Sequence, residues 1–347
     1  MSTGGPRSTM GLRRFVAAMG AVAIGALALG ACKPPPPLGT VATQTATSPQ
    51  WPLLADPAVL AADGKYYVYG SNTFVRLPVH TVDSLAAVSS GTWFAAMKEG
   101  MPAAPPWSVG SDLWAPTVAK GSAGYVLFFA AHRANPPDPA NDTCIGRATS
   151  ANPDGPFVPE AVPFSCGLGT TGGALDPSLF HGPDGIWYLY AAFGDTENPV
   201  HAFVLDGNLD HPRDVAGYAG HWPYAVFGTK FPWEGRFIEN PTMTYDSATG
   251  TYLLAYSAGD WWTPSYSTGL ARCSAPLGLC VGNSGGPWLV SGGGRTGTGG
   301  LSFFTALDGT TKAAYASFAA GAEGTSQPRA GTVAGVSGGW APSLGSP

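Results

Sequence analysis

Charged side chains are scarce in this sequence of 347 residues, because Asp, Glu, Lys and Arg together make up 11% of it, against about a quarter in an ordinary globular domain. The formal net charge is −5, and no cluster of Lys and Arg follows the one that ends at Arg14. A surface without basic clusters is a poor match for nucleic acid or for an anionic lipid surface. The composition therefore argues against nucleic acid as a partner.

Long hydrophobic runs are also missing, apart from the uncharged stretch over residues 15–29. This stretch is too short to span a bilayer as a helix, and arginines precede it, which is typical of an export signal. It ends in LGAC, which resembles a bacterial lipobox, so we expect residues 1–31 to be a lipoprotein signal peptide and Cys32 to carry lipid. Residues 32–50, rich in Pro and Thr, are expected to form a tether. The protein is then anchored by its lipid to the extracytoplasmic face of the cell membrane; a secreted protein is the alternative.

Cysteines are few, and besides Cys32 the sequence has four. In an exported protein these four are expected to form disulfides. They fall into two pairs close in sequence, Cys144 with Cys166 and Cys273 with Cys280, which is the pairing we predict among those formally open. Metal binding is the rival reading, but neither CxxC spacing nor neighbouring histidines accompany these cysteines. We therefore predict no metal at these positions.

Segments with clean helical periodicity are absent, whereas the 49 Gly and 33 Pro indicate a turn-rich, all-β protein. One pattern recurs about every sixty residues: a proline, a short apolar strand, a glycine turn and an aromatic-rich strand. The prolines of the four clear copies are Pro57, Pro116, Pro177 and Pro241. A fifth copy begins at residue 299 without a proline. Such repeats predict a single-domain five-bladed β-propeller over residues 51–345; a two-sheet sandwich would not explain the even spacing.

Acidic residues stand beside these prolines, where a strand begins at the mouth of the propeller channel. Asp56 and Asp176 directly precede a motif proline, and Glu239 lies two residues before Pro241. Because proline favours an extended residue before it and donates no hydrogen bond, we expect three carboxylates from three blades to point into one pocket. Other acids, each followed by glycine, are expected to serve hairpin turns only: Asp63, Asp184 and Asp308.

Three converging carboxylates suit hydrolysis of a glycosidic bond with inversion, in which one activates water and another, of raised pKa, protonates the leaving oxygen. At ADP (55–57), LDPSLF (175–180) and IENP (238–241) the sequence resembles glycoside hydrolase family 43, over nearly all of residues 51–320. This family comprises five-bladed β-propeller arabinofuranosidases, arabinanases and β-xylosidases. The resemblance implies that Asp56 is the general base, Glu239 the general acid, and Asp176 the residue that orients this acid and tunes its pKa.

One departure from the family concerns blade five, where a histidine in a YHAW-like segment commonly helps to hold a channel ion or water. The matching stretch here is AYASF, with Ala316 in that place, which argues against a channel calcium. We therefore predict no cofactor. The departure also keeps an alternative open, a catalytically inactive carbohydrate-binding propeller; a structural surface lipoprotein is a third class.

Substrate contacts are expected from aromatic faces, on which the apolar side of a sugar ring packs. The candidates are Trp114, beside a motif proline, and Trp261, although packing between blades explains any single tryptophan equally well. Arg295, in a glycine-rich stretch, is a candidate to bind sugar hydroxyls, with a solvated loop as the alternative. Glu234 is the rival acid of blade four, and His132 could reach the cleft. The expected partner is a polysaccharide or oligosaccharide, bound by a monomer.

Overall fold

The computed structural model describes part of the chain. The described residues are Met1 and residues 42–43, 51–86, 90–110, 112–137, 142–167, 173–194, 199–210, 223–228, 231–283, 285–323, 329–337 and 343–345. The predicted signal peptide after Met1, the predicted lipidation site Cys32 and the predicted tether, apart from residues 42–43, lie outside that set. The chain divides into two units, Met1–Pro36 and Pro37–Pro347, and the described strands belong to the second. Among the described residues, no helix has the length and apolar character needed to cross a membrane.

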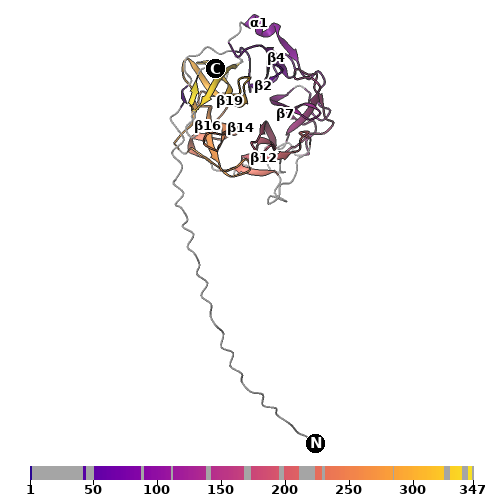
Figure 1. Cartoon of the computed structure of the whole chain (residues 1–347), viewed down its shortest axis with the longest axis vertical. Helices are drawn as coiled ribbons and strands as arrows, with labels where there is room; N and C mark the ends of the chain where they lie inside the picture. The colour runs from indigo at the N-terminus through magenta and orange to yellow at the C-terminus, as the bar shows by residue number, and fades with distance from the viewer. Residues whose placement is uncertain are drawn as a thin grey trace. The chain divides into compact units, whose positions relative to one another are not determined.

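The described strands of the second unit form five sheets, antiparallel except for one short strand, which we number as blades in chain order (Figure 1). Blade one contains β2 (Ala58–Ala62), β3 (Lys65–Tyr69), β4 (Pro78–Val82) and β5 (Met97–Glu99). Blade two contains β6 (Trp114–Gly121), β7 (Gly124–His132), β8 (Thr143–Ser150) and β9 (Val158–Pro159). Blade three contains β10 (Ala174–His181), β11 (Trp187–Phe193), β12 (Val200–Leu205) and β13 (Tyr224–Phe227).

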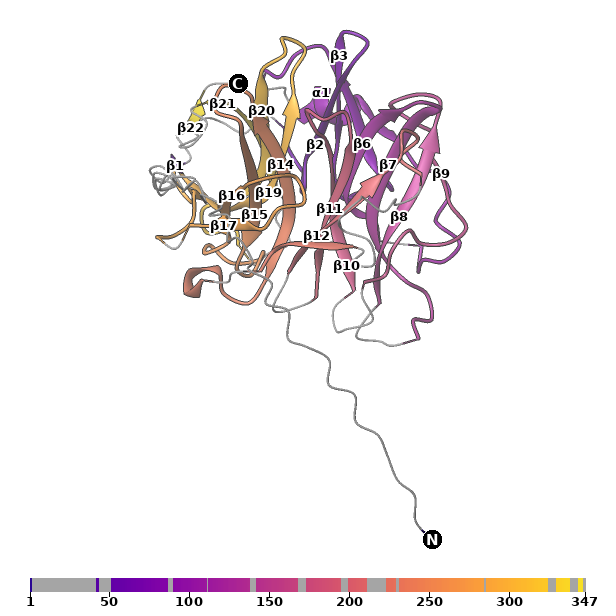
Figure 2. The ribbon, with the colours of Figure 1, turned by 60° about the horizontal axis from the view of Figure 1, so that its bottom comes forward.

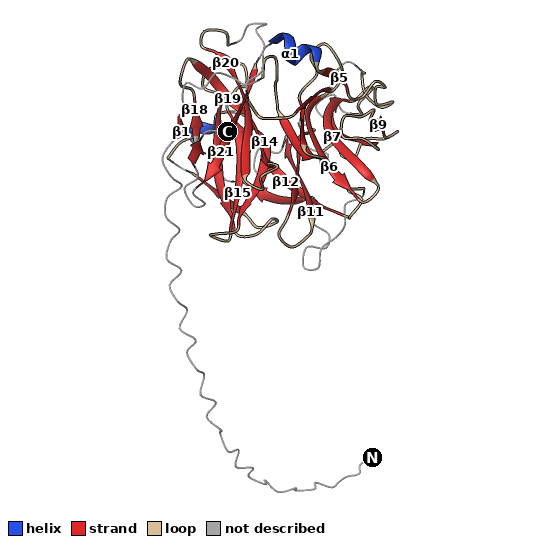
Figure 3. Cartoon of the chain, turned by 45° about the horizontal axis from the view of Figure 1, so that its top comes forward, coloured by secondary structure: helices blue, strands red, loops and turns tan. Residues whose placement is uncertain are grey.

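Blade four is the largest sheet and the one that departs from four strands. It contains β14 (Ile238–Asp246), β15 (Thr251–Ala258) and β16 (Ser267–Cys273), with β17 (Cys280–Gly282) and β18 (Leu289–Val290) both paired to β16 and β1 (Ala42–Thr43) parallel to β18. Blade five contains β19 (Arg295–Thr305), β20 (Thr311–Ala319), β21 (Ala330–Ser337) and β22 (Ser343–Gly345). The described helices are short: α1 (Ser90–Ala95) and the 3-10 helix η2 (Pro232–Glu234) (Figure 3). The predicted all-β class is confirmed.

The first strand of each blade faces the central channel. These inner strands, β2, β6, β10, β14 and β19, contact one another in that order, and β19 returns to β2 (Figure 2). The ring is tied where blade five meets the start of the propeller, because Trp51 exchanges two backbone hydrogen bonds with Gly331 and Leu54 N–H donates to the Arg329 carbonyl oxygen. The predicted five-bladed propeller is therefore confirmed, including a fifth blade without the motif proline.

Five apolar clusters hold the blades together, one at each interface between neighbours. Each forms because strand residues alternate between the two faces of a blade, and both faces are buried against the next blade. Large buried side chains of this kind contribute about 1.5–3 kcal/mol each. Members from the two blades of each interface are, in chain order, Tyr69 and Phe129, Phe128 and Phe203, Tyr190 and Tyr256, Leu270 and Tyr315, and Val333 and Val68.

Hydroxyl groups link the inner strands across the blade boundaries. They stand directly after each motif proline or its equivalent in blade five, except in blade one, where Ala58 takes that place. The bonds are Leu179 N–H to Thr117 Oγ1 (3.2 Å), Ser178 Oγ to Thr242 Oγ1 (3.2 Å), Phe303 N–H to Thr242 Oγ1 (3.1 Å) and Ser302 Oγ to the Pro57 carbonyl oxygen. These bonds fix the position of each inner strand along the channel axis relative to its neighbours. They therefore also fix the relative positions of the side chains at the channel mouth.

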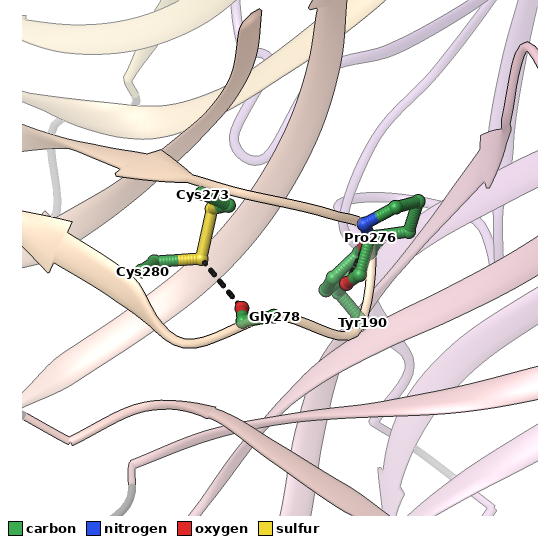
Figure 4. Close-up of a disulfide and its surroundings, with 5 residues drawn as sticks. All are labelled: Tyr190, Cys273, Pro276, Gly278 and Cys280. Carbon is green, nitrogen blue, oxygen red and sulfur yellow. Dashed lines mark hydrogen bonds between the residues drawn. A yellow bond between two sulfur atoms is a disulfide. The ribbon is translucent and has the colours of Figure 1, made fainter. Parts of the chain in front are cut away.

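Two disulfides join Cys144 to Cys166 and Cys273 to Cys280, so the predicted pairing is confirmed. The second closes the turn between β16 and β17 (Figure 4). In that turn the Pro276 carbonyl oxygen accepts a hydrogen bond of 2.7 Å from the buried Tyr190 hydroxyl of blade three. The disulfide therefore also fixes a contact between blades three and four.

Candidate active site

The residue before each motif proline, and Gly300 in the same place in blade five, stands at what we call the bulge position. In blades two to five a register shift interrupts the pairing of the inner strand there, whereas in blade one the position lies two residues before β2. The angle φ is positive at all five places. The residues are Asp56 (46°), Ala115 (45°), Asp176 (53°), Asn240 (48°) and Gly300 (61°). Our expectation of an extended residue before proline was therefore wrong. The bulge removes the ladder bond that proline cannot donate, and it turns the preceding side chain toward the channel mouth.

A pocket of about 800 Å³ opens at this mouth, and Asp56, Asp176 and Glu239 all line it. The positive φ at the bulge positions costs a non-glycine residue about 1–3 kcal/mol, and backbone strain of this kind is concentrated at functional sites. Glu239 stands one residue before its bulge position, where blade two has Trp114. The remaining aromatic and basic members of the lining are Trp114, His132, Trp261, Trp262, Tyr266, Phe318 and Arg329.

Asp56 is held by one side chain of its own blade and by one from blade four. Its Oδ2 accepts a hydrogen bond of 2.5 Å from Ser71 Oγ, and its Oδ1 accepts one of 3.3 Å from Asn240 Nδ2. Gly300 lies against the same carboxylate, and a Cβ there would fall 2.7 Å from Asp56 Oδ1. Blade five therefore needs glycine at its bulge position to leave room for the acid.

Asp176 is buried deepest of the three acids. Its Oδ2 accepts a hydrogen bond of 3.0 Å from the backbone N–H of Asn240. Burial raises the pKa of the Asp176 carboxyl well above its usual value, and the negative charges of Glu239 and Asp56 raise it further. Hydrogen bonds from Asn240 and from the Trp114 side chain oppose this rise in pKa. The charge of Glu239 therefore disfavours ionisation of Asp176.

Glu239 combines burial with a proton-donating neighbour. Burial raises the pKa of its carboxyl to about 7, although a hydrogen bond from Tyr266 lowers it. The Tyr266 hydroxyl oxygen lies 2.6 Å from Glu239 Oε1, so it can donate this bond when Glu239 is ionised. Among the charged neighbours, Asp56 and Asp260 raise the pKa and Arg329 lowers it. A carboxyl with a pKa near neutrality is suited to act as a general acid.

Other predicted substrate contacts divide between the pocket and its surroundings. Trp114 and Trp261 both line the pocket, and Trp261 is 52% exposed. Arg295 is not among the lining residues, because its guanidinium donates to Ser317 Oγ (3.1 Å) and to the Ser317 carbonyl oxygen (2.6 Å). The structure therefore does not bring Arg295 to the acids.

The arginine that does line the pocket is Arg329, which no sequence motif singles out. Its guanidinium lies 4.8 Å from the centre of the Tyr266 ring and 4.6 Å from that of Phe318. It also donates a hydrogen bond to the Trp261 carbonyl oxygen. Asn240, Tyr266 and Ser71 are further site residues that motif spacing missed.

The rival acid Glu234 has a structural role. It is completely buried in η2, away from the pocket lining. Its Oε2 accepts a hydrogen bond from Phe231 N–H and its Oε1 accepts one from the Tyr256 hydroxyl, both of 2.5 Å. His132 does line the pocket, with its ring 4.9 Å from that of Trp114.

A channel ion held by a blade-five histidine does not fit the residues present. Ala316 is buried and pairs with Gly299 between β20 and β19, so neither side chain offers a ligand atom. Within the described part of the chain, no group of three or more His, Cys, Asp or Glu could hold a metal ion. The chemistry that we assign to the three acids uses their own proton transfers.

The chain matches a known protein family over most of its length. The model of the family described as glycosyl hydrolases family 43 matches residues 51–336. The chain belongs to glycosyl hydrolases family 43. Family 43 relatives include a xylosidase/arabinosidase of Bacteroides ovatus, 29% identical over 62% of this chain and 74% of that protein. Xylosidase/arabinosidase 43A of Humicola insolens is 29% identical over 39% of this chain, but the match spans only 42% of that protein's length.

Solved structures of family 43 share the fold. A thermostable family-43 glycoside hydrolase aligns with a TM-score of 0.66 and 20% identity, covering 89% of this chain and 96% of the other. The α-L-arabinofuranosidase of Lactobacillus brevis aligns with a TM-score of 0.67 and 19% identity, covering 86% and 96%. At such identities the likeness supports the propeller fold alone.

Proposed function

We propose that the protein is a glycoside hydrolase that cleaves arabinose- or xylose-containing polysaccharide with inversion at the anomeric carbon. The observation that carries this proposal is the meeting of Asp56, Asp176 and Glu239 in one pocket, with the pKa of Glu239 raised to about 7. Family 43 membership and the xylosidase/arabinosidase names of its relatives support the substrate class.

In the proposed reaction, Asp56 takes a proton from a water molecule whose oxygen bonds to the anomeric carbon. The bond between that carbon and the glycosidic oxygen breaks, and Glu239 gives its proton to the departing oxygen. The hydrogen bonds from Ser71 and Asn240 hold the Asp56 carboxylate in place for this attack. Asp176 accepts a hydrogen bond from the backbone N–H of Asn240 and so holds the backbone beside Glu239.

The sugar itself is proposed to pack on aromatic faces of the pocket. Trp114 lies beside the acids, and the exposed Trp261 and Trp262 meet edge to face with ring centres 5.4 Å apart. This arrangement gives a rim on which sugar rings beyond the cleaved bond can stack.

We propose that the enzyme works as a monomer.

A substrate panel tests the proposed function. Purified protein would be assayed on aryl arabinofuranosides, aryl xylosides, arabinan and arabinogalactan, with binding measured in parallel by calorimetry. We expect turnover of at least one arabinose- or xylose-containing substrate. Binding without turnover would instead favour a carbohydrate-binding propeller, for which Ala316 is the supporting departure, and neither would favour a structural surface protein.

We propose that Cys32 carries a lipid that anchors the enzyme outside the cytoplasm. The support is the apolar stretch over residues 15–29, the LGAC sequence and the Pro/Thr-rich tether. The two disulfides agree with an oxidising compartment. When expressed in a bacterial host that processes lipoproteins, the full chain is expected to incorporate a palmitate analogue and to sediment with membranes.

Cys32→Ser is expected to lose both the label and the membrane association, because the thiol that accepts the lipid is gone. Thr47→Ala, in the same tether, serves as the matched control and is expected to behave as wild type. An unlabelled wild-type protein in the soluble fraction would contradict the anchor.

A further inference from the structure

The Tyr266 hydroxyl lies between two oxygen atoms that both accept hydrogen bonds. Its oxygen is 2.6 Å from Glu239 Oε1 and 2.8 Å from Asn240 Oδ1. A phenolic hydroxyl has one proton and can donate to only one of them. Tyr266 is 2% exposed, so an unmade hydrogen bond here is costly.

The orientation of the Asn240 amide follows from its other neighbour. Asn240 Nδ2 lies 3.3 Å from Asp56 Oδ1, and a carboxylate only accepts hydrogen bonds, so the amide turns its NH2 group to Asp56. Its Oδ1 then faces Tyr266 and needs a donor. The Tyr266 hydroxyl donates this hydrogen bond, which leaves the Tyr266 oxygen free to accept a hydrogen bond from the protonated Glu239 carboxyl.

Every acceptor in this chain of hydrogen bonds has a donor when Glu239 is protonated and Asp56 is ionised. If Glu239 ionises, Tyr266 turns its proton to the carboxylate, because bonds to charged acceptors are stronger, and Asn240 Oδ1 loses its donor. We propose that Asn240 and Tyr266 are positioning residues whose hydrogen bonds, the Asn240–Tyr266 bridge, keep the proton on Glu239 while Asp56 stays ready to accept one. This inference rests on the proposed function for its role, although the bridge itself can be measured without turnover.

The bridge also gives the Tyr266 hydroxyl a second hydrogen-bond acceptor during the reaction. Once Glu239 has given its proton to the departing oxygen, the Tyr266 hydroxyl can donate to the new carboxylate. At the same time Asp56 has gained the proton of the attacking water and no longer needs the full charge-assisted bond from Asn240. The hydrogen bonds of Asn240 to Asp56 and of Tyr266 to Glu239 thus both change with the same proton transfers. No proton passes through these two residues from one acid to the other.

Substitutions of Asn240 have precedents within the propeller. Alanine already stands at the bulge position of blade two, with φ of 45° at Ala115, and glycine stands at that of blade five, with φ of 61° at Gly300. Asn240→Ala therefore preserves a backbone that this fold accepts, and Asn240→Gly provides a second variant should the first fail to fold. Both keep the backbone N–H that donates to Asp176.

The experiment is a double-substitution cycle read from the titration of Glu239. The full chain would be labelled with ¹³C-carboxyl glutamate, and the Glu239 signal assigned by its loss in Glu239→Gln. In Asn240→Ala, Tyr266 is free to donate wholly to the carboxylate, so the Glu239 inflection is expected about one pH unit lower than in wild type. In Tyr266→Phe, adding Asn240→Ala is expected to leave the inflection within about 0.3 units.

Charged groups that face Glu239 from other elements stay in place throughout this cycle. They are Asp56 and Asp176 at their bulge positions, Asp260 after β15 and Arg329 before β21. Tyr256→Phe is the matched control, because it removes a buried tyrosine hydroxyl bonded to the structural Glu234; the Glu239 inflection is expected to remain at its wild-type position.

The bridge is overturned if Asn240→Ala and Asn240→Gly leave the Glu239 inflection unchanged. It is also overturned if Asn240→Ala shifts the inflection as much in the Tyr266→Phe background as it does when Tyr266 is present. If the wild-type protein turns over none of the substrates while the Glu239 inflection shifts as expected in the double-substitution cycle, the proposed function is contradicted and the bridge still stands. In an active enzyme, the alkaline limb of kcat/KM is expected to move with the NMR inflection in Asn240→Ala.

Discussion

Asp56→Asn is expected to lower kcat by roughly 10²–10⁴-fold while changing KM little. The amide keeps the shape of the side chain and its place beside Ser71 and Gly300, but it cannot take a proton from water. The measurement is steady-state hydrolysis of whichever arabinose- or xylose-containing substrate the wild type turns over. Folding would be checked by thermal unfolding of both proteins.

The control for this substitution is Asp63→Asn in the same blade. Asp63 lies at the glycine turn between β2 and β3 with φ of 52°, a conformation that Asn also tolerates, and it is absent from the pocket lining. Near wild-type kcat is expected for Asp63→Asn. Equal activity of Asp56→Asn and wild type would remove Asp56 from the reaction.

Glu239→Gln is expected to lower kcat by an amount that depends on the leaving group. With a sugar or alkyl alcohol, which departs only when protonated, the loss is expected to reach roughly 10²–10⁴-fold. With a nitrophenol, which departs as a stable anion, the loss is expected to be far smaller. The measurement compares the two substrate types in wild type and variant.

The pH profile provides a second result for the same substitution. Glu239 must be protonated to act, and its pKa is raised to about 7, so wild-type kcat/KM is expected to be high below that pH and to fall as pH rises through it. In Glu239→Gln this limb is expected to vanish. Glu234→Gln, which alters the buried rival acid, is expected to retain it; the reverse outcome would make Glu234 the acid.

The propeller could be predicted because its signal is repeated in the sequence. Each blade has a glycine turn between two apolar strands and a bulge position with positive φ, and proline follows that position in four blades. The same repeat put Asp56, Asp176 and Glu239 in register, which is why residues distant in sequence could be expected in one pocket. Blade five is predicted from a degenerate copy of the repeat that begins at the same interval, although Leu301 stands where the others have proline.

The partners of the acids could not be predicted in this way, because they depend on side chains that cross between blades. Asn240 stands at a bulge position but acts through an amide that reaches Asp56 of blade one. Tyr266 comes from the loop before β16 and fits only because Gly299 of blade five leaves room, since a Cβ there would fall 2.1 Å from its ring. Neither relation leaves a spacing pattern in the sequence.

The choice of arginine shows the same limit. Arg295 and Arg329 both belong to blade five, and the glycine-rich surroundings of Arg295 drew attention to it. In the folded chain Arg295 bonds to Ser317 on the next strand, whereas Arg329 lies over the Tyr266 ring in the pocket. The strand pairing of blade five, and not the composition of the surrounding sequence, decides which arginine reaches the site.

The most direct test of the central claim is the anomeric configuration of the first sugar released, followed by ¹H NMR before mutarotation. Two carboxyls that act on opposite sides of the bond, with a water molecule between the base and the anomeric carbon, predict a product of inverted configuration. A first-formed product of retained configuration would contradict the account, because it requires a carboxylate that attacks the sugar itself.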